Sequence, residues 1–186
     1  MPIIRSEDGE REGIMQVSKL MLVSARTAPK SGGVDDILTA IVFGEEKESL
    51  AAEMDKIAEE RKIDAFKRDA KNVKDSEAVV LIGVRGTKKF DVNCGACGYA
   101  NCDEFEKAEK RTGQDFTGAT CIFKALDLGI ALGSAAKTAS ILNVDNRIMY
   151  RIGAAARRLN LLPEASVIMG IPVSAKGKSI YFDRKV

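Results

Sequence analysis

The cysteines are the residues whose type and spacing point most directly to chemistry. All four lie in one short stretch, at Cys94, Cys97, Cys102 and Cys121, in the pattern C-x2-C-x4-C-x18-C. Four thiolates form a complete ligand set for a zinc ion or for an iron–sulfur cluster. A zinc ion would hold the chain in shape, whereas a cluster would exchange electrons.

Two glycines accompany the first pair of cysteines. Gly95 and Gly98 tolerate a positive φ, so the chain can turn tightly here and bring backbone N–H groups toward cluster sulfides. Such N–H donors help to set a reduction potential. Cys121 precedes an expected long helix, whose N-terminal dipole favours a thiolate. These features predict a [4Fe–4S] cluster.

Zinc, disulfides and a purely structural role are the alternatives to a cluster at these cysteines. Structural zinc sites usually consist of two short cysteine pairs, and the long gap between Cys102 and Cys121 departs from that pattern. Disulfides are disfavoured in the reducing cytoplasm, where we expect this protein. The absence of histidine excludes His-ligated zinc, a Rieske-type cluster and a Ser–His or Cys–His nucleophile pair. Any metal site would therefore have to rely on thiolates, carboxylates or backbone groups.

Composition sets broad limits on the class of protein. The chain has 186 residues, of which 45% are apolar, enough for one domain with a sizeable core. Its 29 basic and 27 acidic side chains nearly balance, so we expect neither nucleic acid nor membrane as a partner. The first ten residues contain no apolar segment typical of a signal peptide, and no apolar run is long enough to span a membrane.

The elements that must position the cysteines can be inferred from periodicity. The expected helices cover residues 13–26, 47–61, 64–74, 103–112, 121–142 and 146–159, and the expected strands cover 36–43, 78–84 and 165–173. Residues 1–10 are expected to be irregular. The strand at 78–84 is apolar on both faces and therefore central. Helices and strands thus form a mixed α and β fold around one sheet, with residues 85–122 as a cysteine-rich segment inside a single domain, 1–186.

The cysteine run itself resembles a known cluster domain. The stretch 94–102, closed by Cys121, is similar to the four-cysteine domain of Rnf-type electron-transport subunits and corrinoid iron–sulfur proteins. Nearly the whole chain resembles an uncharacterised family of ferredoxin-domain proteins from anaerobic microbes. The resemblance implies a [4Fe–4S] cluster on Cys94, Cys97, Cys102 and Cys121, and a redox partner protein.

Three further segments resemble the flavin-dependent nitroreductases. They are residues 24–32, similar to the helix and loop beside the flavin, residues 126–134, similar to a long helix, and residues 167–172 followed by Arg184. This likeness implies a nitroreductase-like α+β fold, a central mixed sheet flanked by helices, and a homodimer with FMN at its interface. It makes Arg26, Lys30, Ser31 and Arg184 the candidates for binding the FMN phosphate.

The flavin loop departs from the nitroreductase pattern. Asp35 and Asp36 stand where that family usually has amide side chains, and an acidic pair is unfavourable beside a phosphate. Three hypotheses follow. The protein is an iron–sulfur electron carrier, an FMN-dependent reductase fed by the cluster, or a structural zinc protein.

The cations Arg85, Lys88 and Lys89 form either a docking patch for an acidic redox partner or a solvated loop.

Overall fold

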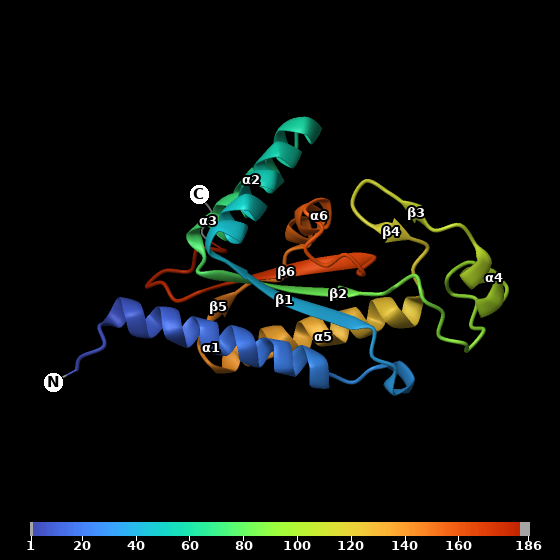
Figure 1. Ribbon diagram of the computed structural model, residues 1–186, viewed down its shortest axis with the longest axis horizontal. Coiled ribbons are helices and arrows are strands. Elements are labelled where there is room, and N and C mark those ends of the chain that lie inside the picture. The colour runs from blue at the N-terminus through green and yellow to red at the C-terminus, as the bar shows by residue number, and fades with distance from the viewer. Residues whose placement is uncertain (1, 183–186) are drawn as a thin grey trace.

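A single antiparallel sheet organises the chain. The computed structural model describes residues 2–182, and its four-stranded sheet has the order β1-β2-β6-β5 (Figure 1). The strands are β1 (Ile37–Phe43), β2 (Ala78–Val84), β6 (Val167–Ser174) and β5 (Asp145–Asn146). Every pair of neighbours in this sheet runs antiparallel. The α+β class is confirmed, but the strand directions differ from the mixed sheet that the resemblance implied.

The connection between β1 and β2 accounts for the antiparallel direction. The helices α2 (Gly44–Arg61) and α3 (Asp64–Asp75) follow β1 as a helical hairpin. Two helices return the chain to the end of the sheet that it left, and Phe43 is therefore paired with Ala78 in the register of β1 and β2. A single crossover helix would have brought the next strand back in parallel.

The central position of β2 is confirmed. All seven of its residues are buried, and the strand separates two apolar cores. Val79 and Leu81 belong to the core beneath α2, α3 and α6, whereas Val80 and Ile82 belong to the core beneath α1 and α5. This alternation is the period-two pattern of a strand whose two faces are both covered.

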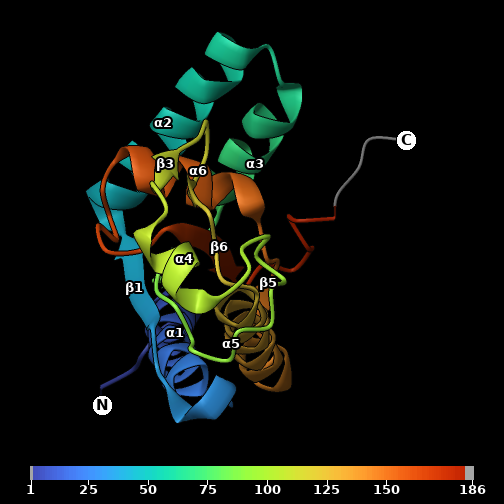
Figure 2. The same cartoon turned by 90° about the vertical axis from the view of Figure 1, so that its right-hand side faces the viewer.

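The helices lie in two layers, one on each face of the sheet. The helices α1 (Ser6–Thr27) and α5 (Ile122–Ile141) lie side by side on one face, and α2, α3 and α6 (Tyr150–Arg158) cover the other (Figures 1 and 2). Among residues 2–182, no helix is long and apolar enough to cross a membrane.

Several boundaries differ from the sequence-based expectation. The helix α1 begins at Ser6, inside the stretch expected to be irregular, because Glu7 and Asp8 in its first turn complement the helix dipole. The helix expected at 103–112 is α4, which spans only Cys102–Lys107. The chain then forms a small hairpin from β3 (Arg111–Thr112) and β4 (Thr117–Gly118). Strands of two residues are too short to show a period, so the pattern missed β3, β4 and β5.

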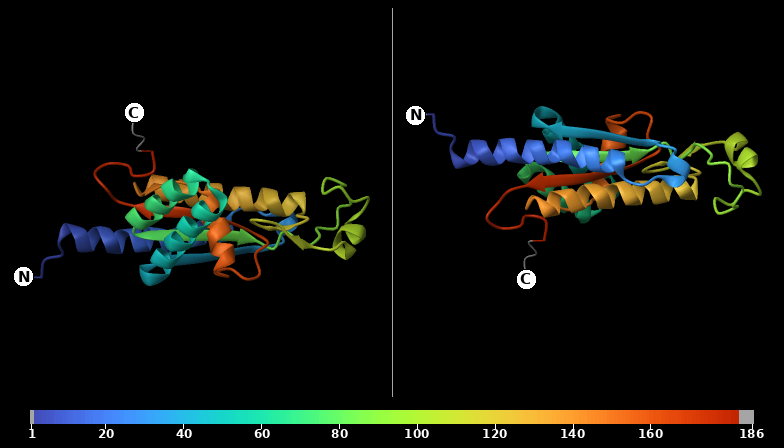
Figure 3. Two further views of the ribbon diagram at one scale, coloured as in Figure 1. Left: turned by 90° about the horizontal axis from the view of Figure 1, so that it is seen from above. Right: turned by 90° about the horizontal axis from the view of Figure 1, so that it is seen from below.

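The segment between β2 and α5 projects from one end of the sheet. It carries the cysteine loop, α4 and the β3–β4 hairpin. Both views in Figure 3 place it beyond the ends of α1 and α5. Backbone hydrogen bonds hold its base. The Cys121 N–H donates to the Gly86 carbonyl at 2.8 Å, and the Thr117 N–H donates to the Ser166 carbonyl at 3.0 Å. The segment is thus fastened to the sheet at its base.

Candidate metal centre

All four cysteines line one small cavity between the cysteine loop, α4 and the start of α5. Cys94 and Cys97 lie in the loop before α4, Cys102 is the first residue of α4, and Cys121 is the N-cap residue of α5. Cys94 is exposed, Cys97 is partly exposed, and the other two are buried. The fold therefore brings together the four residues that the sequence singled out.

Backbone turns and one asparagine shape the loop. Gly95 and Gly98 have φ values of 71° and 89°, and the Gly98 N–H donates to the Gly95 carbonyl at 2.9 Å. The Cys102 N–H donates to Asn93 Oδ1 at 2.8 Å, and the Asn93 N–H lies 3.3 Å from Cys102 Sγ. Cys102 thus has an N–H donor to its sulfur already in place, and such donors stabilise thiolate and cluster charge.

Aromatic side chains form much of the remaining wall. Phe90, Phe105 and Phe123 line the cavity, and Phe90 packs against Phe123 with ring centroids 4.9 Å apart. Phe105 is only 1% exposed and has the Tyr99 ring edge-on at 5.8 Å. An apolar wall around four thiols restricts water, which is one of the factors that set the potential of a bound cluster.

The four cysteines line this cavity, but their side chains do not converge on one point. Its volume is about 10 Å³, roughly the space of one water molecule. Within residues 2–182, no three Cys, Asp or Glu side chains lie close enough together to hold a single metal ion. The donor set suits a cluster ligated by thiolates, but the cavity must widen to admit one. Cys94 is exposed and Cys97 is partly exposed, so widening of the cavity would require their loop to shift outward.

The cations near the cysteines do not form a free basic patch. Lys89 pairs with Asp91, Asp103 and Glu106 at 3.1, 2.8 and 3.3 Å. Hydrogen bonds to these carboxylates raise the pKa of Lys89, and the hydrogen bond to Asp103 has the largest effect. Lys89 in turn lowers the pKa of Asp103. Arg85 pairs with Glu164, and Lys88 pairs with Asp36. The docking-patch interpretation of Arg85, Lys88 and Lys89 therefore loses its support.

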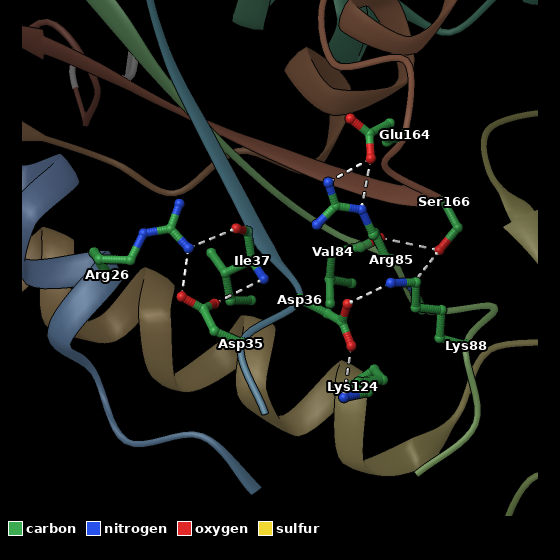
Figure 4. Close-up of polar contacts among 11 residues, drawn as sticks. Arg26, Asp35, Asp36, Ile37, Val84, Arg85, Lys88, Lys124, Glu164 and Ser166 are labelled. Atoms are coloured by element: carbon green, nitrogen blue, oxygen red, sulfur yellow. Dashed lines mark hydrogen bonds and ion pairs between the residues drawn. The ribbon is translucent and has the colours of Figure 1, made fainter. Parts of the chain in front are cut away.

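The residues expected to bind the FMN phosphate surround one loop, but each is engaged within the chain. Arg26 pairs with Asp35 and donates to the Ile37 carbonyl at 3.1 Å (Figure 4). Lys30 donates to the carbonyls of Ala25, at 2.9 Å, and Arg26 at the end of α1.

Ser31, the third candidate, is bound by an acidic side chain. Its N–H and its hydroxyl both donate to Asp127 Oδ1 at 2.8 Å.

Burial raises the pKa of Asp35, but the hydrogen bonds from Arg26 and the Ile37 N–H lower it below its usual value overall. Arg184, the fourth candidate, lies outside residues 2–182. The three described candidates thus contact carboxylates or carbonyls, so the loop as folded does not fit a phosphate.

Buried charges beside this loop are the residues that pattern reasoning missed. Lys124 is 0% exposed and Asp127 is 2% exposed, although both lie in the most apolar helix of the chain. Asp36, at 6% exposure, pairs with Lys124 at 2.8 Å. Charged residues spaced by one helical turn within an apolar helix were the available signal, because burial of such residues requires partners.

Solved structures with a similar fold include nitroreductases. Nitroreductase CinD from Lactococcus lactis matches 95% of this chain and 81% of its own, with a TM-score of 0.60 and 13% identity. The nitroreductase from Saccharomyces cerevisiae matches 90% of this chain and 84% of its own, with a TM-score of 0.59 and 11% identity. An oxidoreductase containing FMN matches 88% of this chain and 67% of its own, with a TM-score of 0.55 and 12% identity. The protein therefore has a nitroreductase-like fold.

Sequence comparison defines the family more narrowly. Residues 117–184 match a family model described as an uncharacterized protein containing a ferredoxin domain. An uncharacterized protein of Archaeoglobus fulgidus is 49% identical over 182 residues, which are 98% of this chain and 97% of that protein. The chain belongs to this family of ferredoxin-domain proteins, as the resemblance of nearly its whole length implied.

Proposed function

We propose that the protein is an iron–sulfur electron carrier that holds one [4Fe–4S] cluster on Cys94, Cys97, Cys102 and Cys121. The observation that carries this proposal is that one cavity is lined by all four cysteines. A cubane divides its ligands among four separate irons, which suits sulfurs spread around a cavity better than sulfurs meeting at one point. Membership of a ferredoxin-domain family supports the same assignment.

The chemistry that a bound cluster would supply is one-electron exchange. The chain's own residues would hold and tune it. Four thiolate ligands would leave no iron open to a substrate, so the role that this ligand set would support is electron exchange with a partner protein. Phe90, Phe105 and Phe123 line the cavity and would exclude water from the buried side of a bound cluster. The Asn93 N–H, 3.3 Å from Cys102 Sγ, stabilises negative charge on that sulfur.

Iron and sulfide analysis tests the proposal directly. Anaerobically purified wild-type protein, produced with ample iron, should be brown and contain about four irons and four sulfides per chain, as a [4Fe–4S] centre requires. Each Cys→Ser change should lower the iron content and alter the electron paramagnetic resonance signal of the reduced protein. Ala96→Ser is the matched control, because it adds a hydroxyl to the same loop without removing a thiol, and it should retain full loading.

Two results would contradict the cluster. Colourless wild-type protein from iron-replete cells would reject it. One zinc and no iron per chain would establish the structural zinc alternative instead, with Cys102→Ser then loosening the fold and no redox signal in any variant.

An FMN-dependent reductase fed by the cluster is the second candidate. Its support is the fold, which is shared with an oxidoreductase containing FMN. To bind the phosphate, Arg26 and Ser31 would have to leave Asp35 and Asp127. Denaturing the purified protein and measuring released flavin by fluorescence separates the candidates. No flavin from cluster-loaded protein rejects this one, and one FMN per chain would establish it.

A further inference from the structure

A buried lysine lies directly behind the wall of the cysteine cavity. Lys124 is 0% exposed and lies one helical turn after Cys121 on α5. Its ammonium is 5.3 Å from the centroid of the Phe90 ring, within the range of a cation–π contact. Phe90 in turn lines the cavity and packs against Phe123, which also lines it. Lys124 and the cavity therefore share the Phe90 ring.

The positive charge of Lys124 has one close counter-charge. Asp36 Oδ2 lies 2.8 Å from Lys124 Nζ, and Asp36 Oδ1 lies 3.1 Å from Lys88 Nζ (Figure 4). Burial raises the pKa of Asp36, but the contacts with Lys124 and Lys88 more than offset this and keep the carboxylate ionised at neutral pH. The side chain of Lys88 is 59% exposed, so water screens its charge. The side chain of Lys124 is 0% exposed, so water does not screen its charge.

We propose that Lys124 raises the reduction potential of the cluster and that Asp36 moderates this effect. The inference rests on the proposed function. Reduction adds one electron, supplied by a partner protein, to the cluster, and no bond forms or breaks. A buried cation close to the cluster stabilises the reduced form more than the oxidised form, because the reduced form carries one more negative charge. A buried anion has the opposite effect.

Midpoint potentials of loaded variants test the inference. We would titrate wild-type protein, Lys124→Met, Asp36→Asn and Lys88→Met with redox mediators and follow the electron paramagnetic resonance signal. Lys124→Met, which keeps the length of the side chain, should shift the midpoint to more negative values. Asp36→Asn should shift it to more positive values. Lys88→Met removes an exposed cation from the same carboxylate, and its shift should be clearly smaller than that of Lys124→Met.

Opposite shifts of the midpoint potential in Lys124→Met and Asp36→Asn distinguish an electrostatic role of these residues from a structural one. A purely structural role predicts looser folding in both variants and no opposed shifts, so unmoved potentials with full iron content would overturn the inference. If Asp36→Asn alone does not fold, Lys124→Met/Asp36→Asn serves instead, because adding Asp36→Asn must move the midpoint back up from that of Lys124→Met. Absence of iron from the wild type would reject the proposed function, a result distinct from loaded protein with unmoved potentials.

Discussion

At the scale of residues, this chain stabilises charge by pairing carboxylates with specific partners. Burial raises the pKa values of Asp35, Asp36 and Asp115, but hydrogen bonds from neighbouring side chains lower each of them below its usual value overall. Asp115 receives its hydrogen bonds from Tyr150 and from Arg61, whose Nη1 lies 2.5 Å from Asp115 Oδ1. This contact fastens the β3–β4 hairpin to the body of the molecule.

Tyr150, one of the hydrogen-bond partners of Asp115, should make the stability of the fold sensitive to alkaline pH. Burial, and then the hydrogen bond to Asp115, raise the pKa of Tyr150 from 10.0 to about 12. In that interval the unfolded chain releases the phenol proton while the folded chain retains it, so stability falls as the pH rises from about 10 to about 12. Tyr150→Phe should remove this part of the loss.

Urea unfolding at about pH 9 and about pH 11 measures the effect, as the change in midpoint between the two conditions. The change should be smaller for Tyr150→Phe than for the wild type. Tyr99→Phe removes a phenol elsewhere and is the control. Equal changes in all three proteins would contradict the role assigned to the contact between Tyr150 and Asp115.

At the scale of elements, two glycines decide how closely α6 approaches the sheet. A Cβ placed on Gly153 would lie 1.6 Å from the Ile168 carbonyl oxygen in β6. A Cβ on Gly170 of β6 would lie 2.1 Å from Cγ2 of Ile152. The α6 backbone at Gly153 therefore contacts the β6 backbone, and the β6 backbone at Gly170 contacts the Ile152 side chain. Only glycine at these two positions permits such close approach.

Gly153→Ala should consequently be strongly destabilising, by about 3 kcal/mol or more, because backbone rather than a flexible side chain blocks the added methyl. Gly13→Ala is the matched control in α1, since nothing lies within 4 Å of its added Cβ. It should stabilise the fold by about 0.5–1 kcal/mol by reducing the freedom of the unfolded chain. Urea unfolding gives both values, and similar effects of the two changes would show that the close approach of α6 is unimportant.

At the scale of the whole molecule, the outer face of the α1 and α5 layer carries apolar side chains. Leu20 and Val23 on α1 are 48% and 56% exposed, and Leu126 and Ile130 on α5 are 54% and 45% exposed. These residues point away from the buried stripes of their helices. We propose that a second copy of the chain covers this face in a homodimer, as the nitroreductase resemblance implied.

Charge placed on that face should separate the two copies. Val23→Lys/Ile130→Lys should shift the mass measured by light scattering after gel filtration from that of two chains to that of one, because an interface cannot bury unpaired ammonium groups without cost. Ile63→Lys changes an apolar residue of similar exposure, 40%, between α2 and α3, and should leave the mass unchanged. Wild-type protein with the mass of one chain would contradict the dimer.

The sequence by itself singled out the four cysteines as the candidate ligand set, and it determined the central strand and the α+β class. Each of these is encoded locally, because cysteine spacing, an apolar run and helical periodicity involve residues close together in the chain. It could not determine that β1 and β2 run antiparallel, because that depends on how α2 and α3 pack. The nitroreductase-like fold and the family came from resemblance rather than from these patterns.

Only the tertiary structure decided which charges meet. Arg26 and Ser31 are candidate phosphate ligands in the sequence, but Asp35 and Asp127 occupy them in the fold. Asp36 and Lys124 lie far apart in the chain and meet at 2.8 Å behind the cysteine cavity. The physical reason is that a buried charge needs a partner, and the partner is chosen by the packing of β1 against α5 rather than by any local pattern.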